Sequence, residues 1–285
     1  KTRTMTIGPM SLRAVLKSST PTATQAKTTM ISTDFAPILP DGPAPANVGA
    51  LVTTRGGGRS RGVFESLNLG DHVGDEAGAV AANRELVYQT IGVWPVWLNQ
   101  VHGTRVVDVA VVDGLVPEAD AAVVRQPGIA CTVMTADCLP VLFCDEAGTV
   151  VAAAHAGWRG LLAGVLESTV VSMNVPAKTL MAWLGPAIGP TAFEVGGEVR
   201  DAFIGVSVTA EIAFQPAAPG KWWLDIYQLA RQRLAGQGVT RVYGGGLCTV
   251  SDAERFFSYR REGQTGRMAA VVWLKDMPIV DRSLI

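Results

Sequence analysis

The sequence predicts a single α+β domain built on mixed β-sheets, extending from about residue 31 to residue 285. The chain of 285 residues is 48% hydrophobic and 17% charged, which indicates a well-buried enzyme core rather than a disordered or fibrous chain. Short apolar runs occur both as hairpins and as β-α-β pieces, a pattern that is typical of mixed sheets. No internal repeat and no strong linker divides the chain, so we expect one domain.

The first 30 residues differ in composition from the rest of the chain. They contain five basic residues, no acidic residue and eleven Ser or Thr, and they lack the apolar core of a secretory signal. An organellar transit peptide has a similar composition. We instead expect a tag remnant or an over-extended translation start, with Met30 as the true start, and we place residues 1–30 outside the fold.

Composition also restricts the partners and the compartment. The net charge of −1 provides no electrostatic footprint for nucleic acid or an anionic membrane. The most apolar run, Thr179 to Phe193, is interrupted by two prolines and two glycines and is shorter than the roughly 18–20 residues of a membrane span. Four cysteines without the spacing of a disulfide scaffold indicate a reducing cytoplasm. We therefore expect small-molecule partners, and the oligomeric state stays open.

Local patterns predict the elements of the first half of the chain. A first strand covers residues 48–54, and the basic, glycine-rich loop at 55–62 is either an anion cradle or an exposed flexible loop. Asp75 is a suitable N-cap for a helix that ends at Gly92. Its buried stripe consists of Val80, Leu86, Val87 and Ile91. Two strands, 94–101 and 104–112, form a hairpin whose bend carries His102.

The second half of the chain alternates strands and helices. The predicted strands are 119–124, 129–135, 180–184, 240–243 and 268–274, together with the two strands of a hairpin within 136–160. The predicted helices are 159–173, 198–203 and 225–234, the last one opened by Trp222-Trp223-Leu224-Asp225 and ended by Gly236. Proline at 176 and glycine at 236 account for two of the predicted helix ends.

The hairpin within 136–160 carries the strongest chemical signal. Cys138 stands where its first strand begins and His155 where its second strand ends, so antiparallel pairing brings the two residues together. With His102 from the preceding bend, they provide nitrogen, sulfur and nitrogen donors. Such a set suits Zn²⁺ with a fourth position left for water or substrate. As alternatives, His102 is an ordinary turn residue and Cys138 a buried core thiol.

Histidine is scarce, and this scarcity excludes several metal sites. The chain contains three histidines, whereas a multicopper oxidase needs about ten to hold its coppers, so copper-dependent polyphenol oxidation is not expected. Close cysteine pairs of the kind found in structural zinc sites are absent from the sequence. The third histidine, His72, is expected to have a structural role.

A second catalytic hypothesis uses the same pair of residues. Cys138 and His155 are compatible with the thiolate–imidazole pair of a cysteine hydrolase that acts on an amide, for example in a cell-wall precursor. The neighbouring Asp137 either orients the histidine or caps a turn. The turn at 156–160 with Arg159 is a candidate anion site, and Arg55 and Arg59 are further cationic candidates.

Many blocks of the chain, in order, resemble the laccase-domain or YfiH-like family, once named polyphenol oxidoreductases and now regarded as zinc-dependent purine nucleoside phosphorylases. The N-terminal blocks are T-R-x-G-G-x-S at 54–60, S-L-N-L-G at 66–70, H-V-G-D at 72–75 and N-R at 83–84. The central blocks are Q-V-H-G at 100–103, T-A-D-C-x-P at 135–140 and H-A-G-W-R-G at 155–160. The C-terminal blocks are G-P-A-I-G at 185–189, F-E-V-G at 193–196, F-F-S-Y-R-R at 256–261 and T-G-R at 265–267.

The resemblance implies a four-layer α/β/β/α fold with mixed sheets and a zinc ion held by the catalytic residues His102, Cys138 and His155. It implies phosphorolysis of adenosine, inosine, guanosine and methylthioadenosine, with inorganic phosphate as co-substrate and adenosine deamination as a second activity. The expected residues that bind substrate or phosphate are Arg55, Ser60, Asn68, Arg159 and Glu194.

Overall fold

The structure is a computed structural model that describes residues 35–111 and 116–276. The expected extension, residues 1–30, lies outside the described residues, as does Val112 at the end of one expected strand. Among the helices of the described part, none combines the length and the apolar character that crossing a bilayer requires.

The first layer of the domain is one long helix. Helix α1 (Ala77–Ile91) packs its buried Val87 against Leu51, Met134 and Val271 of the sheet below it. The expected apolar stripe is confirmed, since Val80 and Val87 are buried and the other two members are partly covered. Gly92 ends the helix with φ of 70°, the left-handed conformation that glycine adopts at low cost.

The second layer is a four-stranded sheet with the order β1-β13-β5-β2. Its strands are β1 (Val48–Val52), β2 (Trp94–Val96), β5 (Ile129–Thr135) and β13 (Met268–Leu274). β1 and β5 both pair antiparallel with β13, whereas β2 pairs parallel with β5. The C-terminal strand therefore lies between two strands from the first half of the chain.

The third layer is a six-stranded sheet with the order β12-β8-β6-β7-β4-β3. Its strands are β3 (Val106–Asp108), β4 (Ala121–Val124), β6 (Leu139–Asp145), β7 (Val151–Ala156), β8 (Leu180–Leu184) and β12 (Arg241–Gly244). The predicted hairpin is confirmed: β6 and β7 are neighbours at the centre of this sheet, and Leu139 pairs with Ala156. Parallel and antiparallel neighbours occur in both sheets, which confirms mixed sheets.

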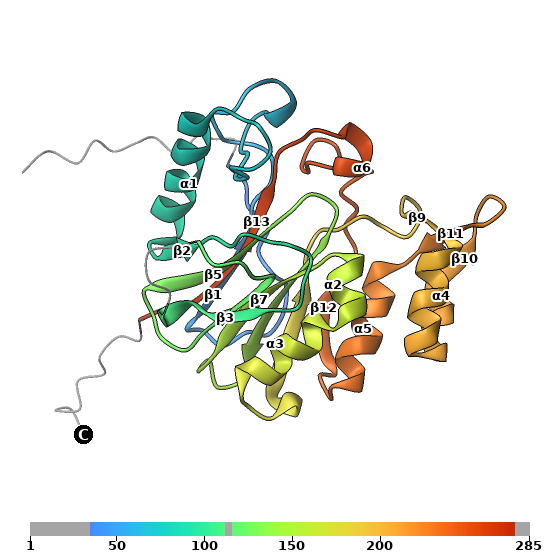
Figure 1. The fold of residues 1–285 in the computed structure, drawn as a ribbon. Helices are drawn as coiled ribbons and strands as arrows, with labels where there is room; N and C mark the ends of the chain where they lie inside the picture. Colours follow the sequence, from blue (N-terminus) through green and yellow to red (C-terminus); the bar gives the residue numbers. More distant parts are fainter. Residues whose placement is uncertain (1–34, 112–115, 277–285) are drawn as a thin grey trace, which may run out of the picture. The chain divides into compact units, whose positions relative to one another are not determined.

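The fourth layer consists of helices on the far face of the six-stranded sheet (Figure 1). They are α2 (Trp158–Ala163), α3 (Val165–Met173) and α5 (Ile226–Gly236), whereas α4 (Gly197–Val206) packs beside them against the short strands β9 (Glu194–Gly196) and β11 (Lys221–Leu224). Side chains alternate along β6, so that Val141 and Phe143 face these helices while Leu142 and Cys144 face the four-stranded sheet. One apolar core thus separates the two sheets and another lies under each helical layer, which confirms the four-layer α/β/β/α fold.

The remaining elements are short. A three-stranded sheet contains β9 (Glu194–Gly196), β10 (Phe214–Pro216) and β11 (Lys221–Leu224). Short 3₁₀ helices cover Gly62–Phe64, Val109–Val111, Ala177–Thr179 and Val208–Ala213, and α6 covers Tyr259–Glu262. The pair Trp222-Trp223 is therefore in a strand, and the helix expected after it begins at Ile226 with Asp225 as its cap.

Three further sequence-based expectations were wrong in detail. Residues 94–96 and 106–108 lie in different sheets, so His102 is in a connection between sheets and not at the tip of a hairpin. The helix expected at 159–173 is divided at Gly164, whose φ is 103°. The cap of α1 is Glu76, which accepts from Gly78 and Ala79, while Asp75 accepts from Asn68 and from the Glu76 amide.

Candidate metal centre and substrate cavity

Three donor side chains meet where the apolar core between the two sheets ends. His155 lies near the end of β7 and alternates with Ala154 and Ala156, which face the helices, so His155 points toward the other sheet. Cys138 directly precedes β6, and Pro140 pairs with His155 across the hairpin. His102 comes from the connection between β2 and β3, with φ of 61°. The structure therefore brings the three predicted ligands together.

The distances among the donors fit a small metal ion. One ligand atom from each of His102, Cys138 and His155 lies within 4.8 Å of the others, and Cys138 Sγ is 3.7 Å from His102 Nε2. Standard zinc–sulfur and zinc–nitrogen lengths in a tetrahedral site place those two atoms about 3.6 Å apart. The donor chemistry and this separation both suit Zn²⁺.

A buried aspartate supports the centre. Asp120 is fully buried, and its Oδ1 lies 2.8 Å from Nδ1 of His155. The same carboxylate accepts backbone hydrogen bonds from Val101, His102 and Gly103 at 3.2, 2.9 and 2.6 Å. Sequence reasoning missed Asp120, although a carboxylate within the apolar run at 119–124 is an unusual feature, because buried acidic groups are rare unless they are paired.

The charges in the centre favour an ionised thiol. Burial opposes ionisation of Cys138, but His155 and His102 outweigh this effect and lower the pKa of the thiol. Burial likewise disfavours the charged form of His155, but Cys138 and Asp120 outweigh it and raise the pKa of the imidazole. A thiolate is the form of cysteine that binds metals.

Gly157 allows the ligands to approach one another. A Cβ atom at this position would lie 2.9 Å from both Cys138 Sγ and His102 Cδ2. Gly160 has a similar role, because a Cβ there would lie 3.0 Å from the carbonyl oxygen of Gly103. The two glycines of H-A-G-W-R-G therefore make room for the loop that carries His102.

All three ligands line a cavity of about 360 Å³. One part of its wall is apolar and includes Trp158, Ile188, Phe193 and Ile226. Another part is polar and includes Gln100, whose amide group exchanges two hydrogen bonds with the backbone of Met134. His72, expected to be structural, also lines the cavity. A pocket with an apolar wall and a few polar groups is typical of a small-molecule site.

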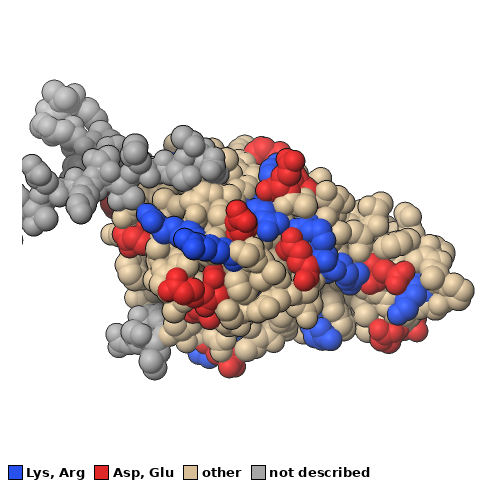
Figure 2. Space-filling model, turned by 90° about the horizontal axis from the view of Figure 1, so that it is seen from above, with Lys and Arg blue, Asp and Glu red and all other residues tan. Residues whose placement is uncertain are grey.

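Three arginines give the cavity a positive character, and they are Arg159, Arg260 and Arg267. Arg159 stacks on Trp158, and Arg260 stacks on Phe193 while donating to the carbonyls of Ala192 and Glu194. Burial lowers the pKa of the Arg267 guanidinium, and the nearby Cys138 and Asp137 oppose that shift. Arg267 is thus within electrostatic reach of the metal ligands. The face around α6, seen from above in Figure 2, carries a band of basic side chains with acidic ones beside it.

Asp137 is the one carboxylate among the described residues that line the cavity, and both of its oxygens are engaged. Oδ1 accepts from Thr249 Oγ1 and Oδ2 accepts from the backbone of Arg260, each at 2.6 Å. Asp137 therefore anchors α6 next to Cys138. Orientation of His155, for which Asp137 was a candidate, is provided by Asp120 instead.

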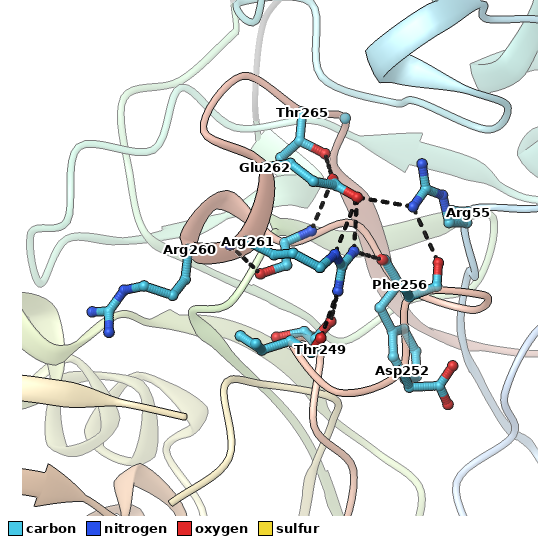
Figure 3. A network of polar contacts seen from close by, with 12 residues as sticks. Arg55, Thr249, Asp252, Phe256, Arg260, Arg261, Glu262 and Thr265 are labelled. Atoms are coloured by element: carbon cyan, nitrogen blue, oxygen red, sulfur yellow. Dashed lines mark hydrogen bonds and ion pairs between the residues drawn. The ribbon is translucent and has the colours of Figure 1, made fainter. Parts of the chain in front are cut away.

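Of the five residues expected to bind substrate or phosphate, Arg159 lines the cavity and the other four do not. Arg55 donates to Glu262, which also accepts from Arg261 and Thr265, and Figure 3 shows this network with Arg260 pointing away from it. Asn68 accepts from the backbone of Arg267, and the carbonyl of Glu194 accepts from Arg260. Ser60 accepts from Asn83 at 2.9 Å. Arg55, Asn68 and Glu194 therefore contact the segments that carry Arg260 and Arg267, whereas Ser60 contacts α1.

With this fold and this donor set, the chain belongs to the multi-copper polyphenol oxidoreductase laccase family, whose model matches residues 49–275. It is 59% identical over 240 residues to the purine nucleoside phosphorylase PA4543 of Pseudomonas aeruginosa, an alignment that covers 84% of this chain and 98% of the relative. It is 53% identical over 239 residues to the purine nucleoside phosphorylase YfiH of Escherichia coli, covering 83% and 98% of the two chains. The resemblance to the YfiH-like family is confirmed.

Solved structures support the same assignment. The crystal structure of Neisseria meningitidis protein NMB0706 matches with a TM-score of 0.83 and 55% identity, covering 84% of this chain and 99% of that one. YlmD from Geobacillus stearothermophilus matches with a TM-score of 0.78 and 30% identity, covering 82% and 94%. The copper in the family's description does not agree with this chain, whose three histidines are far fewer than the roughly ten of a multicopper oxidase.

Proposed function

We propose that this protein is a zinc-dependent purine nucleoside phosphorylase that cleaves adenosine, inosine, guanosine and methylthioadenosine, and that also deaminates adenosine. The observation that carries the proposal is the cluster His102, Cys138 and His155 in the wall of a cavity that also holds three arginines. The relatives named purine nucleoside phosphorylases, at 59% and 53% identity, support the same reaction. The four cysteines are unpaired, which suits a reducing cytoplasm.

The metal would be held by His102, Cys138 and His155. Bound Zn²⁺ would act as a Lewis acid and would lower the pKa of a coordinated water, the chemistry that deamination of a purine requires. Asp120 Oδ1 lies 2.8 Å from Nδ1 of His155, so the carboxylate would hold a proton on that nitrogen and leave Nε2 free to act as a ligand. His155 and His102 lower the pKa of the Cys138 thiol and so favour the thiolate, the form that binds metals.

The apolar wall would receive the purine base. Trp158, Ile188, Phe193 and Ile226 offer ring and aliphatic surface, and burying a flat base against such a surface removes apolar area from water. With a base bound against it, the wall would also exclude water from the reacting centre, which would strengthen the electrostatic interactions there.

The arginines would hold phosphate. Cleavage of the glycosidic bond develops positive charge on the ribose, so the attacking phosphate must be fixed close to the anomeric carbon. Arg267 lies within reach of the metal ligands and Arg159 and Arg260 line the same cavity, and guanidinium groups bind phosphate oxygens through strong charge-assisted hydrogen bonds. Arg55, Ser60, Asn68 and Glu194 would act by supporting these arginines.

Replacement of the cysteine ligand tests the proposal. Cys138→Ala removes the sulfur donor, so we expect loss of stoichiometric zinc and a fall of at least about 100-fold in phosphate-dependent release of adenine or hypoxanthine. Metal analysis and a screen of nucleosides with and without phosphate measure both effects. In the same screen, conversion of adenosine to inosine without phosphate reports deamination.

The matched control is Cys144→Ala, the same substitution at the far end of β6, where the thiol faces the core between the sheets. This variant should retain zinc and activity. Metal-free protein that cleaves nucleosides at the full rate would contradict the proposal. Cleavage of an amide substrate by that metal-free protein would favour the cysteine hydrolase, for which the alignment of Cys138, His155 and Asp120 provides a thiol, a base and an orienting carboxylate.

A further inference from the structure

One buried carboxylate contacts both histidine ligands by different routes. Asp120 precedes β4 in the six-stranded sheet, and its backbone is fixed there because its amide donates to the carbonyl of Arg105 and its carbonyl accepts from the His155 amide at 2.7 Å. The side chain is completely buried. An ionised group in such a place is retained only when it is fully paired.

The first route runs through the ring of His155. Asp120 Oδ1 lies 2.8 Å from Nδ1, within hydrogen-bond distance. A carboxylate on Nδ1 fixes the ring orientation and leaves Nε2 as the donor atom. His155 is only 3% exposed, so the surrounding side chains and this hydrogen bond together restrict the rotation of its ring.

The second route runs through the backbone around His102. Three consecutive amides, from Val101, His102 and Gly103, donate to the two oxygens of Asp120. Consecutive amides that converge in this way form an anion-binding nest, and here the anion is a side chain of the protein. His102 has φ of 61°, an uncommon conformation for a residue with a Cβ atom, and the three hydrogen bonds hold it there.

The nest also joins two parts of the fold. His102 lies in the connection from β2 in the four-stranded sheet to β3 in the six-stranded sheet. Asp120 attaches that connection to the sheet that carries His155. The ring centroids of the two histidines are then 4.7 Å apart.

We propose that Asp120 is the positioning residue of the metal centre, which holds His155 through its ring and His102 through its backbone and thereby determines how tightly the centre binds its metal. This inference rests on the proposed zinc site, because it assigns no metal ligand beyond those three.

The test is Asp120→Asn in the full chain. Asparagine keeps the shape but replaces one acceptor oxygen with an NH₂ group, which faces N–H donors. We expect the Zn²⁺ dissociation constant, measured by competition with a chromophoric chelator, to rise about 10- to 100-fold. With Co²⁺ as the probe, the visible spectrum should also change, since the ligand geometry is altered.

The matched control is Asp145→Asn. Asp145 is the last residue of β6, at the end of the strand away from Cys138. Asp145 is also buried and also accepts from backbone amides and a hydroxyl group, but it is remote from the cluster. A Zn²⁺ affinity of Asp120→Asn within about 2-fold of the unchanged protein, or an equal loss in both variants, would overturn the proposal and leave Asp120 with a structural role only.

A second measurement decides the case if Asp120→Asn does not fold. In the unchanged protein with Zn²⁺ bound and ¹⁵N-labelled histidine, Nδ1 of His155 should carry the proton. An unprotonated Nδ1 would overturn the proposal. Absence of zinc binding by the unchanged protein is a different result, since it refutes the proposed function itself.

Discussion

At the scale of single residues, the candidate metal centre depends on a position that has no side chain. Gly157 has φ of −61°, which any residue adopts, so its backbone does not require glycine. The requirement comes from packing, because a Cβ atom would lie 2.9 Å from atoms of both Cys138 and His102. Side chains that are ligands cannot move aside without changing the centre.

Gly157→Ala should therefore reduce metal binding more than it reduces stability. We expect the Zn²⁺ dissociation constant to rise at least about 10-fold, measured by chelator competition, with a small change in the midpoint of thermal unfolding. Gly205→Ala is the control, because its Cβ would meet no atom within 4 Å and alanine within α4 should add about 0.5–1 kcal/mol of stability. Equal metal affinity in the two variants would show that the ligands tolerate the methyl group.

The residues of the centre differ in how far the sequence predicts them. Cys138 and His155 are predictable because a hairpin brings its two ends together, and a single hairpin is a local structure. Asp120 is not predictable in this way, because its contacts to His155 and His102 span 35 and 18 residues and depend on sheet order. Arg260 and Arg267 lie in the motifs F-F-S-Y-R-R and T-G-R, but their position in the cavity depends on α6 and its anchor at Asp137.

At the scale of elements, the β6–β7 hairpin has chemically distinct ends. The ligands occupy one end, and the turn with Asp145 occupies the other. Burial opposes ionisation of Asp145, but hydrogen bonds from Thr149 and Val150 outweigh it and lower the pKa of the carboxyl group. The turn is thus held by a charged acceptor, and its stability depends on pH.

Asp145→Asn should be less stable than the unchanged protein at pH 7 by about 1.5–3 kcal/mol, the range for hydrogen bonds to a charged group. Because the folded-state pKa lies below the unfolded value of about 3.9, the carboxylate stabilises the fold above that value and loses its effect as the pH falls through the folded-state pKa. Urea unfolding at several pH values measures this, and the two proteins should converge in acid. A constant difference at every pH would contradict the prediction.

Element boundaries show where local patterns are insufficient. Gly92 ends α1 as expected, because the left-handed conformation is a property of that residue. Gly164 divides the helix, but the sequence does not predict this break, since glycine within an apolar periodic run is also compatible with a continuous helix. Trp222 and Trp223 fit either period, and tertiary pairing with β9 and β10 determines that they form a strand.

At the scale of the whole molecule, the core between the sheets connects the layers. It includes Leu142 from β6, Val133 from β5 and Val272 from β13, all nearly inaccessible to solvent. The order of strands in the two sheets was not predictable from local patterns, because β1 pairs with β13 across most of the chain, Val48 opposite Leu274. The class of fold was predictable, since it depends on composition and on the alternation of elements.

Leu142→Ala should lower the free energy of unfolding by about 2–5 kcal/mol, because it leaves a cavity between the sheets. Urea denaturation at pH 7 measures the change. Val171→Ala removes a 72% exposed side chain on α3 and should change stability by less than about 0.5 kcal/mol. A loss below about 1 kcal/mol for Leu142→Ala would mean that the sheets close over the missing atoms.

The central place of β13 has a consequence for synthesis of the protein. Because β13 lies between β1 and β5, the four-stranded sheet cannot assemble until residues 268–274 have emerged from the ribosome. Arg260 and Arg267 emerge just before them. A nascent chain therefore carries all three candidate metal ligands well before it has β13, and pairing of β1 must wait until β13 has been made.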